Sequence, residues 1–297
     1  MNKSFRNILS RVLFRLSPLF PDELYLCLQF YFSMGRRLDL KHPRTMDEKL
    51  QWLKLHQREQ RFTEMVDKLA VKKLISRSLG DEYVARVLAV WNSADDIDIS
   101  NLPDKFVLKT THSGGNTGVV ICNDKKTFDL AAAKDKLRYA MRADVYYRYR
   151  EWPYLNVPRK VFAEEYLGDQ LTDYKFYCFD GDADSVLVCI GRQEGHTKYY
   201  FFDKGWKLCP YNSYAIEAGP DFTLPRPIHI TQLFEMASRL SKGFPCLRVD
   251  FYEVGGRVYF GEYTFYPASG YHPAWLPGTD EHFGEKINLS LCKDYMG

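Results

Sequence analysis

The chain has 297 residues, of which 45% are hydrophobic and 15% aromatic, so it can bury a substantial core. It carries 41 lysines and arginines against 38 acidic residues, and this net charge of +3 does not require a polyanionic partner. Seven cysteines without a C-x-x-C pair favour reduced thiols over a disulfide framework or a zinc site. No apolar run approaches the ~20 residues of a membrane span, so composition predicts a globular protein that is not integral to a membrane.

The first twenty residues predict a basic amphipathic helix. Apolar side chains recur there at helical spacing, at Phe5, Ile8, Leu9, Val12, Leu13 and Leu16, with four basic residues among them. The arginines interrupt the apolar run that a cleaved signal peptide needs. Two interpretations stay open: a helix packed against its own domain, or a helix lying on an anionic membrane surface.

Residues 21–80 have a helical pattern. Thr45 and Glu48 predict a capping box at the start of one helix, and a second helix is expected from about Phe62 to Arg77. Lys68 falls inside that second helix, where its pattern is that of an ordinary surface lysine. Strands and turns follow from about residue 83, interrupted by helices at about 129–142 and 231–243. This order predicts an α+β architecture with antiparallel sheet in the second half.

The most informative segment runs from residue 246 to residue 270, where two alternating strands flank a glycine pair. A two-residue turn would pair Val254 with Arg257 and place Asp250 and Glu262 on opposite faces. A three-residue loop instead gives the pairs Val254 with Val258, Tyr252 with Phe260, Asp250 with Glu262, and Arg248 with Thr264. We adopt the second register because it matches apolar residues with apolar residues.

Two directly opposed carboxylates repel each other, by about 4 kcal/mol at ~4 Å and an effective dielectric of about 20. A positive charge is therefore expected between Asp250 and Glu262. Arg248 can supply part of it, and the two carboxylates with the Thr264 hydroxyl form an oxygen-only set suited to Mg²⁺. The alternative is a pair that points into water or is held by arginine alone.

A glycine loop follows the strand that ends in Lys109. It contains Gly114, Gly115 and Gly118, but the lysine precedes the glycines, unlike a Walker P-loop, and no G-x-G-x-x-G dinucleotide pattern is present. Backbone N–H groups in such a loop can cover phosphates, and a lysine at the strand end can neutralise them. A plain hairpin turn explains the glycines equally well.

In this order, the lysine strand, the glycine loop, "AEEYLG", "DYKF", "RVDF" and "GEYTFYPASG" resemble the ATP-grasp superfamily, and more narrowly the TupA-like ATP-grasp proteins found with bacterial surface-polysaccharide genes. The resemblance extends from near "KHPRTMDEKLQWLK" to about "EKINL". It implies an α+β ATP-grasp fold with two subdomains clasping ATP. The expected division is an N-terminal helical segment at 1–60, a small subdomain with the glycine loop at 61–162, and a large subdomain with the metal-binding hairpin at 163–297.

The resemblance also assigns roles by position. Lys68 and Lys109 match the two phosphate-contacting lysines, and the mobile loop over the phosphates is matched by Ser113, Gly114, Gly115 and Asn116. The adenine site is matched by Glu164 and by the hinge Glu165, Tyr166 and Leu167. Asp173 corresponds to the ribose-binding carboxylate, and Lys175 shares its face. Asp250 and Glu262 match the metal-bridging pair, and Arg248, with Lys109, matches the catalytic cations. Thr264 departs from the usual asparagine, so its role as a metal ligand is the weakest of these assignments.

The implied activity is an ATP- and Mg²⁺-dependent ligase that joins a carboxylate to an amine through an acyl phosphate. The expected substrates are a uronic acid of a capsule, O-antigen or teichuronic-type glycan and an amino acid or similar amine. No nucleic-acid partner is expected, and the implied location is cytoplasmic, with contact at the inner membrane face through residues 1–20 left open. Ser269, Gly270 and His272 are candidates for the substrate site, and His112 is a candidate base.

Two other functions stay open on the residues alone. Asp180, Asp182 and Asp184 form D-x-D pairs that suggest a glycosyltransferase, although acidic residues in a tight turn are ordinary. The basic N-terminal helix suggests a non-catalytic scaffold at a membrane.

Overall fold

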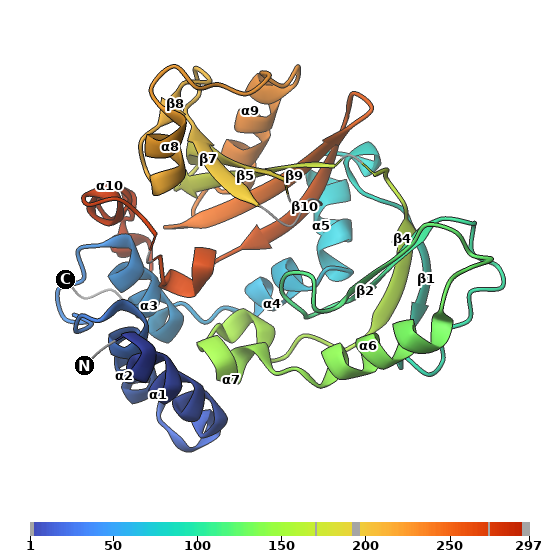
Figure 1. Cartoon of the computed structure of the whole chain (residues 1–297), viewed down its shortest axis with the longest axis horizontal. Coiled ribbons are helices and arrows are strands. Elements are labelled where there is room, and N and C mark those ends of the chain that lie inside the picture. The colour runs from blue at the N-terminus through green and yellow to red at the C-terminus, as the bar shows by residue number, and fades with distance from the viewer. Residues whose placement is uncertain (1–2, 170, 192–196, 273, 293–297) are drawn as a thin grey trace. The chain divides into compact units, whose positions relative to one another are not determined.

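The computed structural model describes residues 3–169, 171–191, 197–272 and 274–292. The chain divides into two compact units. Unit 1 comprises Met1–Arg58, Tyr147–Glu151 and Thr172–Gly297, and unit 2 comprises Glu59–Tyr146 and Trp152–Leu171 (Figure 1). The short segment Tyr147–Glu151 therefore belongs to unit 1 although unit 2 precedes and follows it in the sequence.

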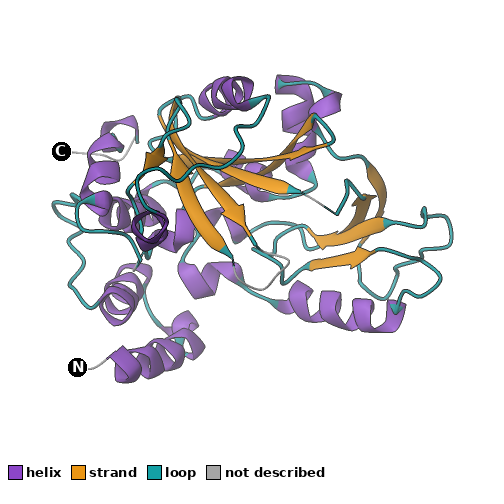
Figure 2. Ribbon diagram, turned by 45° about the horizontal axis from the view of Figure 1, so that its top comes forward, coloured by secondary structure: helices purple, strands orange, loops and turns teal. Residues whose placement is uncertain are grey.

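Unit 1 is built around a six-stranded antiparallel sheet in the order β10-β9-β5-β6-β7-β8, whose strands fan out with a marked twist in Figure 2. The strands are β5 Thr172–Phe179, β6 Asp182–Ile190, β7 Lys198–Phe202, β8 Leu208–Cys209, β9 Leu247–Val254 and β10 Arg257–Thr264. The helices are α1 Lys3–Arg15, α2 Asp22–Met34, α3 Met46–His56, α8 Ser213–Ala218, α9 Ile230–Leu240 and α10 Thr279–Lys286. The predicted antiparallel second half is confirmed.

Alternation along the strands divides this sheet into an apolar and a charged face. Phe176 of β5 and Phe251 of β9 are fully buried, and Phe176 packs edge-on against Phe234 of α9, with ring centroids 4.9 Å apart. Because successive side chains point to opposite sides of a strand, Lys175 and Asp250 lie on the other face. Helix α9 therefore covers the apolar side and leaves the charged side for a site.

Unit 2 contains a four-stranded antiparallel sheet in the order β1-β4-β2-β3. Its strands are β1 Val87–Trp91, β2 Phe106–Thr110, β3 Val119–Cys122 and β4 Val161–Glu165. Its helices are α4 Gln60–Val66, α5 Ala70–Ser78 and α6 Leu130–Arg142, while α7 Val145–Tyr149 spans the boundary between the units. Leu137 of α6 and Leu108 of β2 belong to one buried cluster, so α6 closes one face of this sheet.

The expected single helix from Phe62 to Arg77 is wrong, because the chain breaks between α4 and α5. The Asp67 carboxylate accepts hydrogen bonds from the backbone N–H groups of Leu69 at 2.8 Å and Ala70 at 3.1 Å. An aspartate that bonds to the N–H groups just after it competes with helix continuation and starts a new helix instead. Lys68 therefore lies in the break, not on a helix surface. The capping box at Thr45 and Glu48 is confirmed by both of its reciprocal bonds.

The β9–β10 hairpin combines parts of the two registers considered from the sequence. Its turn is the two-residue one, with Val254 paired to Arg257, and the glycines of the turn have φ of 56° and 72°. The expected Val254–Val258 and Tyr252–Phe260 pairs are therefore wrong. A bulge between Phe260 and Glu262 then shifts the register by one residue, and Asp250 lies opposite Glu262 and Arg248 opposite Thr264, as expected.

The N-terminal helices α1 and α2 lie side by side at one end of unit 1 (Figure 1). They are joined to the Tyr147–Glu151 segment by Arg150, whose side chain is 1% exposed. Its guanidinium donates to the carbonyls of Ser17 at 2.5 Å and Phe20 at 3.1 Å and pairs with Asp22 at 2.8 Å. Arg150 thus fixes two stretches of unit 1 that are far apart in the sequence. Within the described ranges, no helix is long and apolar enough to span a bilayer.

Candidate functional site

The charged face of the unit 1 sheet gathers five ionisable side chains from three neighbouring strands. They are Asp173 and Lys175 on β5, Arg248 and Asp250 on β9, and Glu262 on β10. Lys175 is the cross-strand partner of Asp250, which is in turn the partner of Glu262. The register of β5, β9 and β10 therefore brings these five predicted residues together on one surface.

Asp250 is at the centre of this cluster and only 1% exposed. Arg248 binds it with two parallel bonds, Nε to Oδ1 at 2.7 Å and Nη2 to Oδ2 at 2.8 Å. The same Nη2 reaches Glu262 Oε1 at 3.1 Å, and Lys175 Nζ lies 2.6 Å from Asp250 Oδ2 and 2.8 Å from Asp173 Oδ2. The Thr264 hydroxyl is 3.5 Å from Glu262 Oε1, a weak contact. The repulsion between the opposed carboxylates is thus compensated by two cations.

The charges within the cluster keep both cations protonated. Burial alone would lower the pKa of Lys175, but the Asp250 carboxylate outweighs it and raises that pKa. Burial opposes the charge of Arg248 too, and Asp250 and Glu262 more than compensate, which raises its pKa further. With three carboxylates and two cations the cluster has a net charge of about −1, so it can accept a further positive charge.

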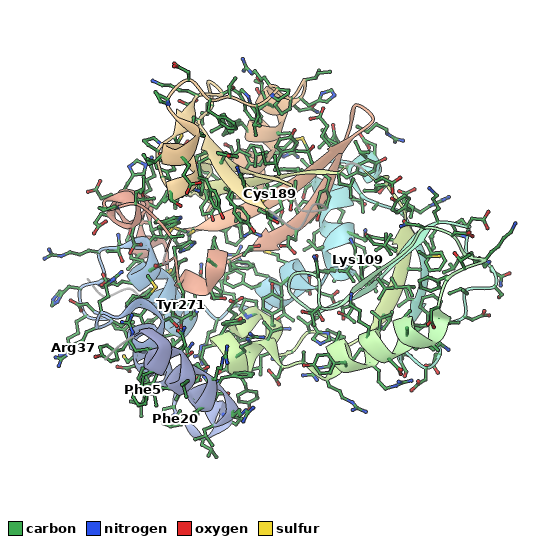
Figure 3. All side chains as sticks on the ribbon, viewed as in Figure 1. Phe5, Phe20, Arg37, Lys109, Cys189 and Tyr271 are labelled. Carbon is green, nitrogen blue, oxygen red and sulfur yellow. The ribbon has the colours of Figure 1, made fainter. Side chains whose placement is uncertain are left out.

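Unit 2 contains a second buried ionic cluster, centred on Glu164 of β4. Lys109 of β2 and Lys72 of α5 both pair with its carboxylate, the latter at 2.9 Å. Lys109 is labelled in Figure 3. Burial alone would raise the pKa of Glu164, but the two ammonium groups lower it, while burial lowers the pKa of Lys72. Two half-buried lysines around one carboxylate leave an excess of positive charge that suits phosphate.

Lys68 and the glycine loop meet at a backbone carbonyl. Lys68 Nζ donates to Ser113 O at 2.8 Å, so the lysine holds the first residue of the loop. The Thr110 hydroxyl donates to Ser113 Oγ at 2.5 Å, and Gly118 packs so closely that an added Cβ would lie 2.0 Å from Thr110 Oγ1. Gly114, Gly115 and Asn116 are exposed between these fixed ends. Both ends of the loop are therefore held by contacts, and its tip is exposed.

The predicted adenine hinge lies at the end of β4. The backbone N–H of Glu165 donates to Arg86 O at 3.0 Å, and its carboxylate accepts from Arg86 N at 2.8 Å. Tyr166 and Leu167 are half-buried, and the Tyr166 hydroxyl bonds to Asp169. His112 is buried near the loop, and burial with the nearby Arg159 charge lowers its pKa to about 4. His112 is therefore neutral at pH 7.

The three predicted substrate-site residues follow β10 in a strained segment of unit 1. Ala268 and Ser269 have φ of 47° and 55°, a left-handed conformation that costs on the order of 1–2 kcal/mol for each non-glycine residue. Gly270 continues it with φ 66°, and an added Cβ there would lie 2.3 Å from Gln51 Nε2. The Ser269 carbonyl in this segment accepts a hydrogen bond from Lys54 Nζ at 2.8 Å.

Two buried residues of opposite charge, Lys54 and Glu151, lie behind Ser269. Neither of them was predicted from the sequence. The Ser269 hydroxyl donates to Glu151 Oε1 at 2.5 Å, and Lys54 Nζ binds Gln51 Oε1 at 2.9 Å. Burial lowers the pKa of Lys54 to about 8 and raises the pKa of Glu151, although each charge stabilises the other. His272 lies beside this pair, with Nδ1 2.5 Å from Asp47 Oδ1 and its ring stacked on Trp275.

Lys72, Lys54 and Glu151 are the functional candidates that sequence reasoning missed. Lys54 falls four residues after buried Leu50 on α3, so its position on the apolar face was a usable signal. Lys72 falls three residues before buried Ile75 on α5, which is a similar but weaker signal. Glu151 has none, because its neighbours are brought together only by the folded chain.

The aspartates of the D-x-D pairs have separate partners. Asp180 accepts from Gly243 N at 2.9 Å, Asp182 pairs with Lys204 at 2.7 Å, and Asp184 pairs with Lys286 at 2.7 Å. In the part of the chain that the structure describes, no group of three or more histidine, cysteine, aspartate or glutamate side chains could hold a metal ion. This holds for the unit 1 cluster too, whose carboxylates are occupied by Lys175 and Arg248. The turn thus gives no support to a metal-dependent glycosyltransferase site.

Two ionic clusters and a glycine loop on antiparallel sheets are the features of an ATP-grasp protein. Residues 48–288 match the TupA-like ATP-grasp family, and the chain belongs to this family. The resemblance and the α+β fold class expected from the sequence are thereby confirmed.

The comparison with solved structures finds three enzymes that this chain resembles. D-alanine–D-alanine ligase from Helicobacter pylori is 18% identical with a TM-score of 0.46, covering 75% of this chain and 61% of the ligase. N5-carboxyaminoimidazole synthetase from Staphylococcus aureus, solved with ADP, is 15% identical with a TM-score of 0.40, covering 69% of this chain and 46% of the synthetase. The ATP-grasp ligase PsnB, solved with minimal precursor, Mg and ADP, is 12% identical with a TM-score of 0.39, covering 74% of this chain and 58% of PsnB. The chain thus spans about three fifths of the first ligase's length. No curated protein matches it significantly.

Proposed function

We propose that this protein is an ATP-dependent carboxylate–amine ligase that works through an acyl phosphate. Membership of the TupA-like ATP-grasp family supports the reaction class. The single observation that carries the proposal is the placement of Asp250 opposite Glu262 with Arg248 bound to both. A surface ion pair does not require two opposed carboxylates bound by one arginine. An enzyme that holds polyphosphate and a divalent cation requires carboxylates and cations on one surface.

The unit 1 cluster suits Mg²⁺ in the chemistry of its donors. Asp250 and Glu262 supply hard oxygen ligands, and Mg²⁺ characteristically takes one or two carboxylates together with waters and substrate phosphates. Arg248 and Lys175 now compensate these carboxylates, and both cations can turn to phosphate oxygens when a metal takes their place. Thr264 would be a minor ligand, since its hydroxyl makes only a 3.5 Å contact with Glu262. A bound Mg²⁺ would neutralise charge on the phosphates during transfer.

The family resemblance assigns the phosphates and the adenine of the nucleotide to residues of unit 2. In this proposal Lys109 and Lys68 bind phosphate oxygens, and Lys72 joins them because it shares the Glu164 carboxylate with Lys109. The exposed tip at Gly114, Gly115 and Asn116, with Ser113 at its base, covers the phosphates through backbone N–H groups. Glu164, Glu165, Tyr166 and Leu167 face adenine, and Asp173 with Lys175 the ribose.

The reaction has two balanced steps. A carboxylate oxygen of the substrate attacks the γ-phosphorus, the bond to the bridging oxygen breaks, and ADP leaves with that electron pair. The amine nitrogen then attacks the acyl carbon, inorganic phosphate leaves, and the amine gives up a proton. Arg248 stabilises the charge that develops on the transferred phosphoryl oxygens, and the family resemblance assigns Lys109 the same role. The loop keeps water away from the acyl phosphate.

We propose a uronic acid of a bacterial surface polysaccharide as the carboxylate substrate and an amino acid or similar amine as the acceptor. The support is the resemblance of the chain to proteins found with surface-polysaccharide genes. Ser269, Gly270 and His272 would line the substrate site, supported from behind by Lys54 and Glu151. The proposed location is cytoplasmic or the inner face of the membrane.

The test measures ADP release from ATP and Mg²⁺ with pairs of uronates and amines. Asp250→Asn and Glu262→Gln should each lower the rate by about 10²–10³-fold, as expected when a group that stabilises transition-state charge is removed. Glu253→Gln is the matched control, because Glu253 is on the same strand and its side chain alternates to the other face. A folded protein that releases no ADP with any pair, or variants that all behave like the control, would refute the proposal.

A further inference from the structure

The outer surface of α1 carries an apolar stripe. Its five side chains are each 44% or more exposed: Phe5 51%, Ile8 54%, Val12 48%, Leu16 44% and Leu19 78%. The spacing of three and four residues places Phe5, Ile8 and Val12 along one line of α1. Leu16 and Leu19 continue this line beyond the end of the helix at Arg15. Phe5 is labelled on α1 in Figure 3. This stripe is defined by these five residues.

The stripe is distinct from the face by which α1 is docked. Leu13 is buried in a cluster with Tyr25 and Leu26 of α2, and Ser10 accepts a bond from Gln29 Nε2 at 2.8 Å. One face of α1 therefore packs against α2 in unit 1, and a second apolar face is exposed to solvent. Residues 1–47 also lie before the matched family segment, so the stripe is not part of the shared core.

The distribution of charged residues favours one kind of partner for the stripe. Residues 1–20 carry four basic and no acidic side chains, whereas the other 277 residues carry 37 basic and 38 acidic ones. Arg11 and Arg15 are exposed and follow Ile8 and Val12 by three residues, on the next row around the helix. An apolar line bordered by arginines complements a surface that is apolar below and anionic above.

The area of the stripe argues against a second copy of the chain as the occupant. Together the five side chains offer roughly 400–700 Å², taking about 150–250 Å² for a fully exposed large side chain. A specific dimer buries about 800 Å² on each partner. A membrane surface needs no such minimum, because an interfacial helix inserts its apolar face only to the depth of the headgroups.

We propose that α1 is a peripheral membrane-binding helix that inserts the apolar stripe into an anionic lipid surface while Arg11 and Arg15 contact the headgroups. This binding is independent of the proposed reaction. It would hold the protein at an anionic lipid surface.

Flotation of the full chain with vesicles tests this proposal. Vesicles of phosphatidylcholine with about 30% phosphatidylserine should carry the protein to the top of the gradient, and vesicles of phosphatidylcholine alone should not. The triple variant Ile8→Gln, Val12→Gln and Leu16→Gln should reduce the bound fraction at least tenfold. Ile228→Gln is the matched control, because Ile228 is 86% exposed in unit 1 but lies outside the stripe.

A second variant separates charge from apolar contact and keeps the test valid if the triple variant is poorly folded. Arg11→Gln with Arg15→Gln should weaken binding about fivefold for each arginine, since each basic residue near an anionic surface contributes about 1 kcal/mol. Raising the salt to about 1 M should have a similar effect by screening. The proposal is overturned if the wild type stays at the bottom, or if both variants float like the control. It is also overturned if the stripe variant only abolishes a concentration-dependent dimer.

Discussion

Replacing Glu164 by glutamine tests the ionic cluster of unit 2. Glu164 is 5% exposed and binds both Lys109 and Lys72, so the neutral amide leaves two ammonium groups without their counter-charge. Removing one partner of a buried ion pair costs about 3–5 kcal/mol. Lys109 retains some solvent contact, with a side-chain exposure of 23%, and glutamine keeps an oxygen acceptor. We therefore expect a loss of about 2–4 kcal/mol in the stability of unit 2 at pH 7.

The pH dependence of this loss has a definite sign. The two lysines hold the pKa of Glu164 below 4.5, so its stabilising contribution is fully present above that pH. It disappears as the pH falls through the lowered pKa, because the carboxyl then protonates in the folded protein too. The difference between wild type and variant should accordingly narrow in acid.

Hydrogen exchange of peptides from β2 and β4 measures this local stability directly, without assuming that the two units unfold together. Glu165→Gln is the matched control, since Glu165 is the next residue of β4 and its carboxylate accepts from Arg86 N. If Glu164→Gln exchanges no faster than the control, the cluster does not stabilise unit 2. A difference that stays constant from pH 7 into acid would refute the assigned cause.

Three further changes have expected outcomes. Gly118→Ala should destabilise unit 2 by about 1–3 kcal/mol, because its Cβ would lie 2.0 Å from Thr110 Oγ1; Gly114→Ala, with no atom within 4 Å, should leave the melting temperature unchanged. Burial lowers the pKa of Lys54 to about 8, so the folded protein releases this proton before the unfolded chain does, and wild-type stability should rise with pH above 8. Lys54→Met should abolish that rise in urea titrations, and parallel profiles would contradict the assignment. Gly256 has φ 72°, so Gly256→Val should lower the free energy of unfolding by about 1–2 kcal/mol, and Gly256→Asn should lower it clearly less. Equal urea midpoints for the two variants would disprove this expectation.

Local patterns in the sequence were sufficient for most elements of the fold. The Thr45 capping box, the helix that begins after Asp129 and the acidic turn between β5 and β6 depend only on neighbouring residues, and each is observed. The break at Asp67 is equally local, but the apolar pattern on both sides of it hid a side chain that bonds to the next turn. Periodicity therefore predicted the helical segment and missed its interruption.

The hairpin shows why a face can be predicted while its register is not. The pairing of Asp250 with Glu262 was expected from matching apolar residues, and the fold achieves it with a shorter turn and a bulge at Gly261. A glycine inside a strand is a known signal for a bulge, so this detail was within reach. The buried contact of Glu151 with Ser269 was not, because 118 residues separate them and only tertiary packing brings them together.

Arg150 has a consequence for the order in which unit 1 is assembled during synthesis. Its carbonyl acceptors at residues 17 and 20 precede it by 133 and 130 residues, and its guanidinium lies 4.2 Å from the ring centroid of buried Tyr25. At ~5–20 residues per second, a ribosome needs roughly 7–26 s to make the intervening chain. During that time the α1–α2 hairpin lacks its contacts with the Arg150 side chain. Residues 17–25 are thus synthesised well before the side chain that completes their packing.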